Sequence, residues 1–72
     1  MSIVAINVRR IIMERCFKQS AIAQKAGYSI KKFNNMLQGR KIITSEDILP
    51  ISEALGVLPN DLFVNLDDQK GA

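Results

Sequence analysis

Apolar residues recur along the first part of this chain at steps of three and four positions, the spacing of one face of an α-helix. Over positions 4–16 the series consists of Val4, Val8, Ile11, Ile12 and Cys16. Arg9, Arg10 and Glu14 fall on the other side of the same helix. The pattern therefore predicts an amphipathic first helix that buries one face.

A second helix is predicted to open at Gln19 and to end at Gly27. Its apolar face consists of Ile22, Ala23 and Ala26. Lys18 is a poor N-cap, so the sequence also allows a start one residue later, with Ser20 as the cap. Gly27 suits the end, because the residue just past a helix often has a positive φ that glycine adopts without strain.

A third helix should follow a tight turn over residues 27–29. Ser29 supplies a side-chain oxygen that can cap this helix, and Gly39 can end it. Phe33, Met36 and Leu37 can face inward, which leaves lysine and asparagine at positions 31, 32, 34 and 35 for the outside. These side chains donate hydrogen bonds, as a surface that meets phosphates and base edges must. The two helices and their turn predict a helix-turn-helix.

The rest of the chain predicts a fourth helix and a short fifth one. Thr44 is a good N-cap for the fourth, with Asp47 in its first turn and Gly56 at its end. Pro50 lies inside this helix, where it should remove one backbone hydrogen bond. Pro59 opens the fifth helix, over 59–64. We expect one domain over residues 1–66 and a frayed tail over 67–72.

Charge is divided unevenly along the 72 residues, whose net charge is +3. Positions 1–45 carry nine basic side chains and one acidic one, a net charge of +8. Positions 46–72 carry one basic side chain and six acidic ones, a net charge of −5. Such segregation favours a positive face directed at a polyanion and a negative side turned away from it.

Composition narrows the functional classes further. The single cysteine and the absence of histidine exclude a disulfide framework and the usual zinc sites within one chain, so we expect no metal and no cofactor. The sequence also lacks a glycine-rich phosphate loop and a nucleophile–base pair, and we expect no enzyme activity. No apolar run approaches the ~18 residues of a membrane span, and the N-terminus is unlike a secretory signal. We therefore expect no membrane partner and a cytoplasmic location.

With its elements placed, the chain resembles the Cro/C1-type helix-turn-helix (XRE-like) family of phage repressors and bacterial transcriptional regulators. The likeness covers about Val8 to Phe63 and rests on short matches in the family's order. They are Gln19, Ile22-Ala23, Gly27-Tyr28-Ser29, the inward pair Phe33 and Met36, Gln38-Gly39-Arg40, ALGV at 54–57 and NDLF at 60–63. The resemblance implies an all-α, compact five-helix bundle of the lambda-repressor-like DNA-binding type, with helices two and three as its helix-turn-helix.

The resemblance also implies a set of DNA contacts. Gln19 and backbone amides at the start of the second helix would hold a phosphate. The residues that would read the major groove from the third helix are Ile30, Lys31, Asn34 and Asn35. Those that would contact phosphates beside it are Lys32, Gln38, Arg40 and Lys41. Tyr28 and Ser29 lie in the turn, where the Tyr28 ring can pack while its hydroxyl approaches the DNA backbone.

The likeness predicts how individual bases would be read. Lysine can donate to guanine O6 and N7, asparagine can pair with adenine N6 and N7, and Ile30 can pack on a thymine methyl group. Each good bidentate pair discriminates by about 1–3 kcal/mol, so two or three such contacts give a useful preference.

The chain departs from the family pattern at two positions that change together. Many members carry an arginine on the first helix and a glutamate near the end of the third, and these form a buried ion pair. Ile12 and Leu37 stand there in this chain. Because replacing both partners by packed apolar residues leaves no unpaired charge, we predict that they are buried in contact. Cys16 stands where the family often has glycine, and we expect a buried, inert thiol.

These observations predict a sequence-specific, double-stranded DNA-binding transcriptional regulator, a repressor or Cro-like protein. One domain of this size contacts little DNA, so we expect a homodimer on an inverted-repeat operator with half-sites about 34–36 Å apart. The candidate dimer interface consists of Leu58, Leu62, Phe63, Val64 and Leu66. The alternative is a protein-interaction module, such as the antitoxin of a toxin–antitoxin pair or a phage regulator whose acidic C-terminal half binds a protein partner.

Overall fold

The computed structural model describes residues 2–64, which form four α-helices, one 3-10 helix and no strand. The α-helices are α1 (Ile3–Glu14), α2 (Gln19–Ala26), α3 (Ile30–Leu37) and α4 (Ser45–Leu55), and the 3-10 helix is η1 (Pro59–Phe63). The prediction of an all-α fold is confirmed. The predicted tail and Leu66 lie outside the described residues.

The fifth predicted helix is corrected to the short 3-10 helix η1. The main-chain oxygens of Leu62 and Val64 accept hydrogen bonds from the Asn7 side chain, at 2.9 and 2.8 Å. Asp61 Oδ2 accepts a hydrogen bond from the amide of Leu58 at the start of the element. Side chains thus bind backbone groups at both ends of η1, which is a short element, as 3-10 helices generally are.

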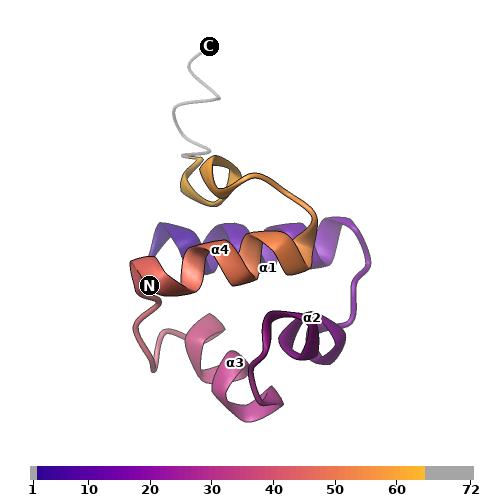
Figure 1. Ribbon diagram of the computed structural model, residues 1–72, viewed down its shortest axis with the longest axis vertical. Helices are drawn as coiled ribbons and strands as arrows, with labels where there is room; N and C mark the ends of the chain where they lie inside the picture. Colours follow the sequence, from indigo (N-terminus) through magenta and orange to yellow (C-terminus); the bar gives the residue numbers. More distant parts are fainter. Residues whose placement is uncertain (1, 65–72) are drawn as a thin grey trace.

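The elements are stacked in layers along the vertical direction of Figure 1, with α1 and α4 running across it. In Figure 1, α1 and α4 cross the middle of the view, α2 and α3 lie at its lower end, and η1 lies above. Helix α2 packs against α3 and α4, α1 packs against α3 and η1, and α4 also packs against η1. The α2–α3 pair and η1 therefore occupy opposite ends of the molecule.

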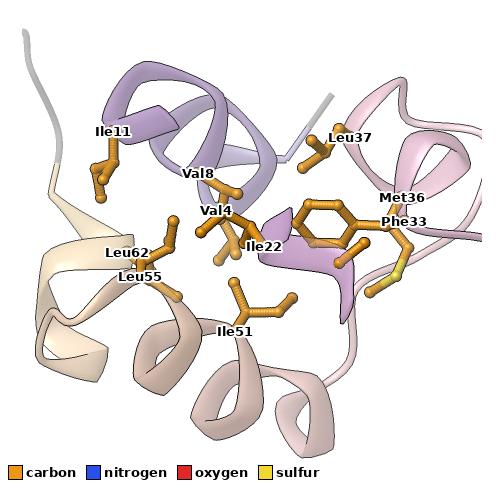
Figure 2. Close-up of a cluster of buried hydrophobic side chains, with 11 residues drawn as sticks. Val4, Val8, Ile11, Ile22, Phe33, Met36, Leu37, Ile51, Leu55 and Leu62 are labelled. Carbon is orange, nitrogen blue, oxygen red and sulfur yellow. The ribbon is translucent and has the colours of Figure 1, made fainter. Parts of the chain in front are cut away.

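One hydrophobic core holds all five elements together (Figure 2). Its buried members are Val4, Val8, Ile11, Ile22, Ala23, Phe33, Met36, Leu37, Ile51, Leu55 and Leu62. Each large aliphatic or aromatic member contributes about 1.5–3 kcal/mol by leaving water. Because η1 supplies Leu62, the short C-terminal element is part of the monomer's own core.

Local capping explains where the helices begin and end. Helix α2 begins at Gln19, after Lys18, whose side chain makes no capping hydrogen bond; the boundary that the sequence left open is thereby fixed. The helix ends at Gly27, with φ +87°. Ser29 Oγ accepts from the amide of Lys32 at 3.1 Å, as predicted for the cap of α3. A capping box between Thr44 and Asp47 starts α4, and Pro50 lies inside that helix.

The end of α1 corrects the expectation for Cys16. Its side chain is exposed rather than buried. Its φ is +57°, the one positive value at a non-glycine residue of the described chain. The amides of Cys16 and Phe17 donate to the carbonyls of Met13 and Ile12, a Schellman motif that needs a left-handed residue at position 16. A glycine at this position would avoid the strain.

Ile12 and Leu37 meet the prediction in part. Leu37 is 1% exposed and belongs to the core, whereas Ile12 is half-buried and packs against that core. Both side chains line an open groove of about 380 Å³ between α1, the start of α2 and the end of α3. Its other lining residues are Arg9, Met13, Cys16, Phe17 and Gln19. Ile12 is only half-buried because its outer side faces this groove.

Candidate nucleic-acid interface

Helix α3 has two opposite faces. Phe33, Met36 and Leu37 are buried, while Ile30 is 53% exposed and Lys31 and Lys32 are exposed. The buried face fixes the helix on α1 and α2, so the polar face is held rigidly toward solvent. A rigid helix that presents amide and ammonium donors has the shape and chemistry that the major groove admits.

The structure brings all the predicted DNA-contact residues to the end of the molecule that holds α2 and α3. The exposed members are Ser29, Ile30, Lys31, Lys32, Gln38, Arg40 and Lys41. The half-buried members are Gln19, Tyr28, Asn34 and Asn35. None is buried, so all remain available at the surface of this end.

The segment after α3 keeps two basic residues beside that helix. The carbonyl oxygen of Asn35 accepts hydrogen bonds from the amides of Arg40 and Lys41, at 2.9 and 3.2 Å. The chain therefore turns back at the end of α3 and brings Arg40 and Lys41 close to Asn35. This turn places two cations next to the polar face of α3, where flanking phosphates would lie if the helix entered a groove.

Tyr28 packs in the turn, and its hydroxyl is engaged within the protein. The hydroxyl donates to Asp47 Oδ1 at 2.6 Å. Its ring stacks on that of Phe33, with centroids 6.2 Å apart and planes at 10°. Lys32 Nζ lies 5.1 Å from the Tyr28 ring centroid, within reach of a cation–π contact. The expected packing of the ring is found, but the hydroxyl is directed at Asp47 rather than left free for a DNA backbone.

The pKa values of the two partners follow from this contact. Burial, followed by the hydrogen bond and the charge of Asp47, raises the pKa of Tyr28 to about 12. Burial opposes ionisation of Asp47, but hydrogen bonds from Tyr28 and Thr44 and the nearby charge of Lys32 lower its pKa overall. Asp47 is therefore an anion that joins the turn before α3 to the first turn of α4. Sequence reasoning assigned Asp47 only to the helix start and missed this bridge.

Gln19 and Asn34 contact each other directly. Gln19 Nε2 donates to Asn34 Oδ1 at 3.2 Å, and this bond links the first residue of α2 to the polar side of α3. The sequence placed both residues in the DNA-contact set but gave no sign that they form a pair.

The predicted dimer interface is only partly at the surface. Leu58 and Phe63 are 70% and 52% exposed, and Val64 is half-buried. Leu62 is fully buried in the monomer's core, so it is removed from the candidate interface. The reason is that Asn7 holds η1 against α1 and turns Leu62 inward, a contact that the sequence pattern did not reveal.

Residues 2–64 contain neither a metal-binding cluster nor a membrane-spanning helix. No group of three or more cysteine, aspartate or glutamate side chains there could hold a metal ion. No helix in that range has the length and apolar character needed to cross a membrane. Comparisons of the chain with models of protein families, with curated proteins and with solved structures find no match.

Proposed function

We propose that this protein is a sequence-specific, double-stranded DNA-binding transcriptional regulator of the Cro/C1 type, a repressor or Cro-like protein, and not an enzyme. Helices α2 and α3 serve as its helix-turn-helix, and α3 enters the major groove. Bound at an operator that overlaps a promoter, the protein excludes RNA polymerase. The observation that carries the proposal is the polar face of α3, held outward by the burial of Phe33, Met36 and Leu37.

Charge supports the same orientation. The basic residues 31, 32, 40 and 41 lie at the α2–α3 end, on the exposed side of the chain. Within the described residues beyond position 45, all the charged side chains are acidic: Glu46, Asp47, Glu53 and Asp61. A polyanion is attracted to the four basic residues beside α3. Asp47 is the exception among the acidic residues, because it bonds to Tyr28 in the turn before α3 and offsets part of the charge of Lys32.

Useful affinity calls for a second copy of the chain. Phe63 on η1 and Leu58 directly before it expose apolar surface, and η1 lies at the end of the molecule away from α3. We propose that this surface, with Val64, contributes to a homodimer that places two α3 helices on an inverted repeat, about 34–36 Å apart. Substituting Phe63 by aspartate should then lower both the dimer fraction in sedimentation and the affinity for a two-half-site duplex, but not for an isolated half-site.

The proposal is tested by selection from a random duplex pool at near-physiological salt. Wild-type protein should enrich an inverted repeat, and log Kd for it should depend linearly on log salt concentration. Lys32→Gln should weaken binding about evenly across sequences and lower the salt slope by about one, as expected for a phosphate contact. Lys25→Gln is the matched control, because Lys25 is exposed on α2 outside the contact set. This variant should leave both the affinity and the salt slope close to their wild-type values.

Either of two results would contradict the proposal. Retention of DNA without enrichment would reduce α3 to a non-specific phosphate-binding surface. No retention of DNA would favour the alternative function, a protein-interaction module such as an antitoxin or a phage regulator whose partner binds the acidic C-terminal half.

A further inference from the structure

An open hollow lies between the start of α1 and the segment that follows α3. Its volume is about 250 Å³, and its lining residues are Ser2, Met36, Gly39, Lys41, Ile42 and Ile43. Met36 is buried and Ile43 packs against the core, so these two line the hollow from its inner side. The hollow is therefore largely apolar, and Lys41 is its one charged lining residue.

Ile42 projects into solvent beside this hollow. Its side chain is 82% exposed, the largest exposed fraction among the large apolar residues that the structure describes. The residues on either side of it are held in place. The amide of Lys41 donates to the carbonyl oxygen of Asn35, and Ile43 packs against the core. Ile42 is thus an apolar group on an anchored segment, and covering it with another apolar surface would be favourable.

Exposed apolar residues continue from the hollow to η1. Ile3 directly follows Ser2, which lines the hollow, and is itself exposed. Ile6, also exposed, directly precedes Asn7, whose side chain binds the end of η1. Phe63 on η1 is exposed as well. These four residues form what we call the apolar strip: Ile42, Ile3, Ile6 and Phe63. The strip joins the neighbourhood of α3 to the surface already proposed for dimerisation.

The distribution of charge favours a second copy of the chain as the partner of the strip. A two-fold interface brings each residue against the same surface of the other copy, so a charged face repels itself. Residues 2–8 carry no charged side chain, whereas the exposed faces of α3 and α4 carry lysines and glutamates. Arg10, one turn beyond Ile6, is paired with Glu14 at 2.7 Å. The apolar strip can therefore face its own copy without strong repulsion, except at Lys41.

The hollow has room for the Ile42 side chain of the other copy. An apolar cavity of about 150 Å³ holds a benzene molecule, and the side chain of isoleucine contains fewer carbon atoms than benzene. Because Ile42 lies at the edge of the hollow, each copy can place its Ile42 in the hollow of the other. Two-fold symmetry requires such a reciprocal contact.

A contact beside α3 also suits the proposed operator. Half-sites one helical turn apart lie about 34–36 Å from each other along the duplex, so both α3 helices must face the same DNA. A dimer joined end to end through η1 alone would hold its α3 helices at opposite ends, because α3 and η1 lie at opposite ends of each molecule (Figure 1). Contacts along the apolar strip allow the two molecules to lie side by side.

We infer that the apolar strip is a two-fold dimer interface in which Ile42 of each copy enters the hollow of the other, and that Lys41 opposes this contact until DNA is bound. The two Lys41 ammonium groups come close to the axis and repel each other. Phosphates of bound DNA, or a high salt concentration, reduce that repulsion. The role of DNA rests on the proposed function, whereas the interface itself is tested without DNA.

Sedimentation equilibrium of the full chain without DNA measures the dimer dissociation constant. Wild type should dimerise more tightly at ~1 M than at ~0.1 M NaCl, because the Debye length shortens from about 10 Å to about 3 Å. Lys41→Gln should tighten the dimer about twofold or more at the lower salt concentration and remove most of the salt effect. Ile42→Ser should weaken it about tenfold or more at both concentrations. Met13→Ser is the matched control, because Met13 is 79% exposed and lies at the other end of α1; it should stay within about twofold of wild type.

A disulfide tests the geometry of the contact. In a Cys16→Ser background, Ile42→Cys should give a disulfide-linked dimer under mild oxidation, because a bridge needs Cα atoms within about 7 Å of each other. Met13→Cys in the same background should stay largely monomeric. Thermal melting followed by circular dichroism establishes that each variant is folded.

Four results would each overturn the inference: an unchanged dimer in Ile42→Ser, a wild-type dimer that weakens as salt rises, no disulfide in Ile42→Cys, or a chain that is monomeric at both salt concentrations. The last result would indicate that a different protein covers the strip. If such a result accompanies enrichment of a DNA sequence by wild type, the inference fails alone. If the chain dimerises as expected but enriches no sequence, the proposed function fails and the interface stands.

Discussion

Asn7 should be the polar side chain on which the stability of this fold depends most. It is fully buried, and its amide donates to the carbonyl oxygens of Leu62 and Val64 at 2.9 and 2.8 Å. The substitution Asn7→Leu keeps the branching at Cγ and replaces both polar atoms by methyl groups. It therefore removes both hydrogen bonds to η1, and the long one of 3.4 Å that Asn7 Oδ1 accepts from Arg10 Nη2, with little change of shape. The two carbonyl groups of η1 and its C-cap remain.

The expected loss can be estimated from the surroundings of each acceptor. The bond to Leu62 is buried, so its carbonyl would be left without a partner, at a cost of about 1–3 kcal/mol. The bond to Val64 is only partly buried, so water can replace it and the cost is about 1 kcal/mol. We expect a total of about 2–4 kcal/mol. A domain of this length has roughly 4–11 kcal/mol in all, so the variant would lose a large fraction of its stability.

Urea unfolding of the full chain measures this difference at equilibrium. Ser52→Ala is the matched control: Ser52 is equally buried, but its hydroxyl donates to Leu49 within the same helix, at 2.9 Å. The control should lose less than about 1 kcal/mol, because the Leu49 carbonyl keeps its helical partner. A loss below about 0.5 kcal/mol in Asn7→Leu, or one equal to that of Ser52→Ala, would refute the idea that Asn7 anchors η1.

Three further substitutions test other parts of the structure by the same urea assay. Asp47→Asn should cost about 1 kcal/mol of unfolding free energy at pH 7 through the weakened cap. Because folding lowers the pKa of Asp47, the stabilisation that the carboxylate provides is present above its ordinary pKa of 3.8. The difference between the two proteins should vanish as the pH falls through the lower folded-state pKa. A difference that persists at low pH would contradict this. Cys16→Gly should stabilise by about 1 kcal/mol, because φ is +57° there; a loss would show that the thiol contributes packing. Leu37→Glu should cost ~3–5 kcal/mol as an unpaired buried charge, and adding Ile12→Arg should recover about half of it; no recovery would show that positions 12 and 37 are not paired.

The features that the sequence predicted correctly are those set by neighbouring residues. The cap at Ser29, the left-handed stop at Gly27 and the start of α4 at Thr44 each depend on atoms within a few positions. The inward face of α3 follows from periodicity alone. Such features need no knowledge of the rest of the fold.

The missed features depend on partners far away in the chain. Asn7 binds residues 55 and 57 positions later, and Tyr28 binds Asp47 19 positions later. In the sequence Asn7 is one polar position in an amphipathic helix, and nothing local shows that η1 covers it. The exposure of Cys16 was missed for a different reason, because a positive φ at a non-glycine residue is uncommon enough to be passed over.

The two long-range side-chain contacts act on different parts of the proposed function. Asn7 fixes η1, which lies away from α3 and carries or adjoins the exposed Phe63 and Leu58. The hydrogen bond between Tyr28 and Asp47 fixes the turn before α3, and the Tyr28 ring contacts the ammonium group of Lys32. Loss of the first contact should therefore reduce stability and dimerisation while folded molecules keep their base preference. Loss of the second should reduce affinity through Lys32 even where the protein stays folded. Under the proposed function, dimerisation and base contacts would therefore depend on different side-chain contacts, although one hydrophobic core supports both regions.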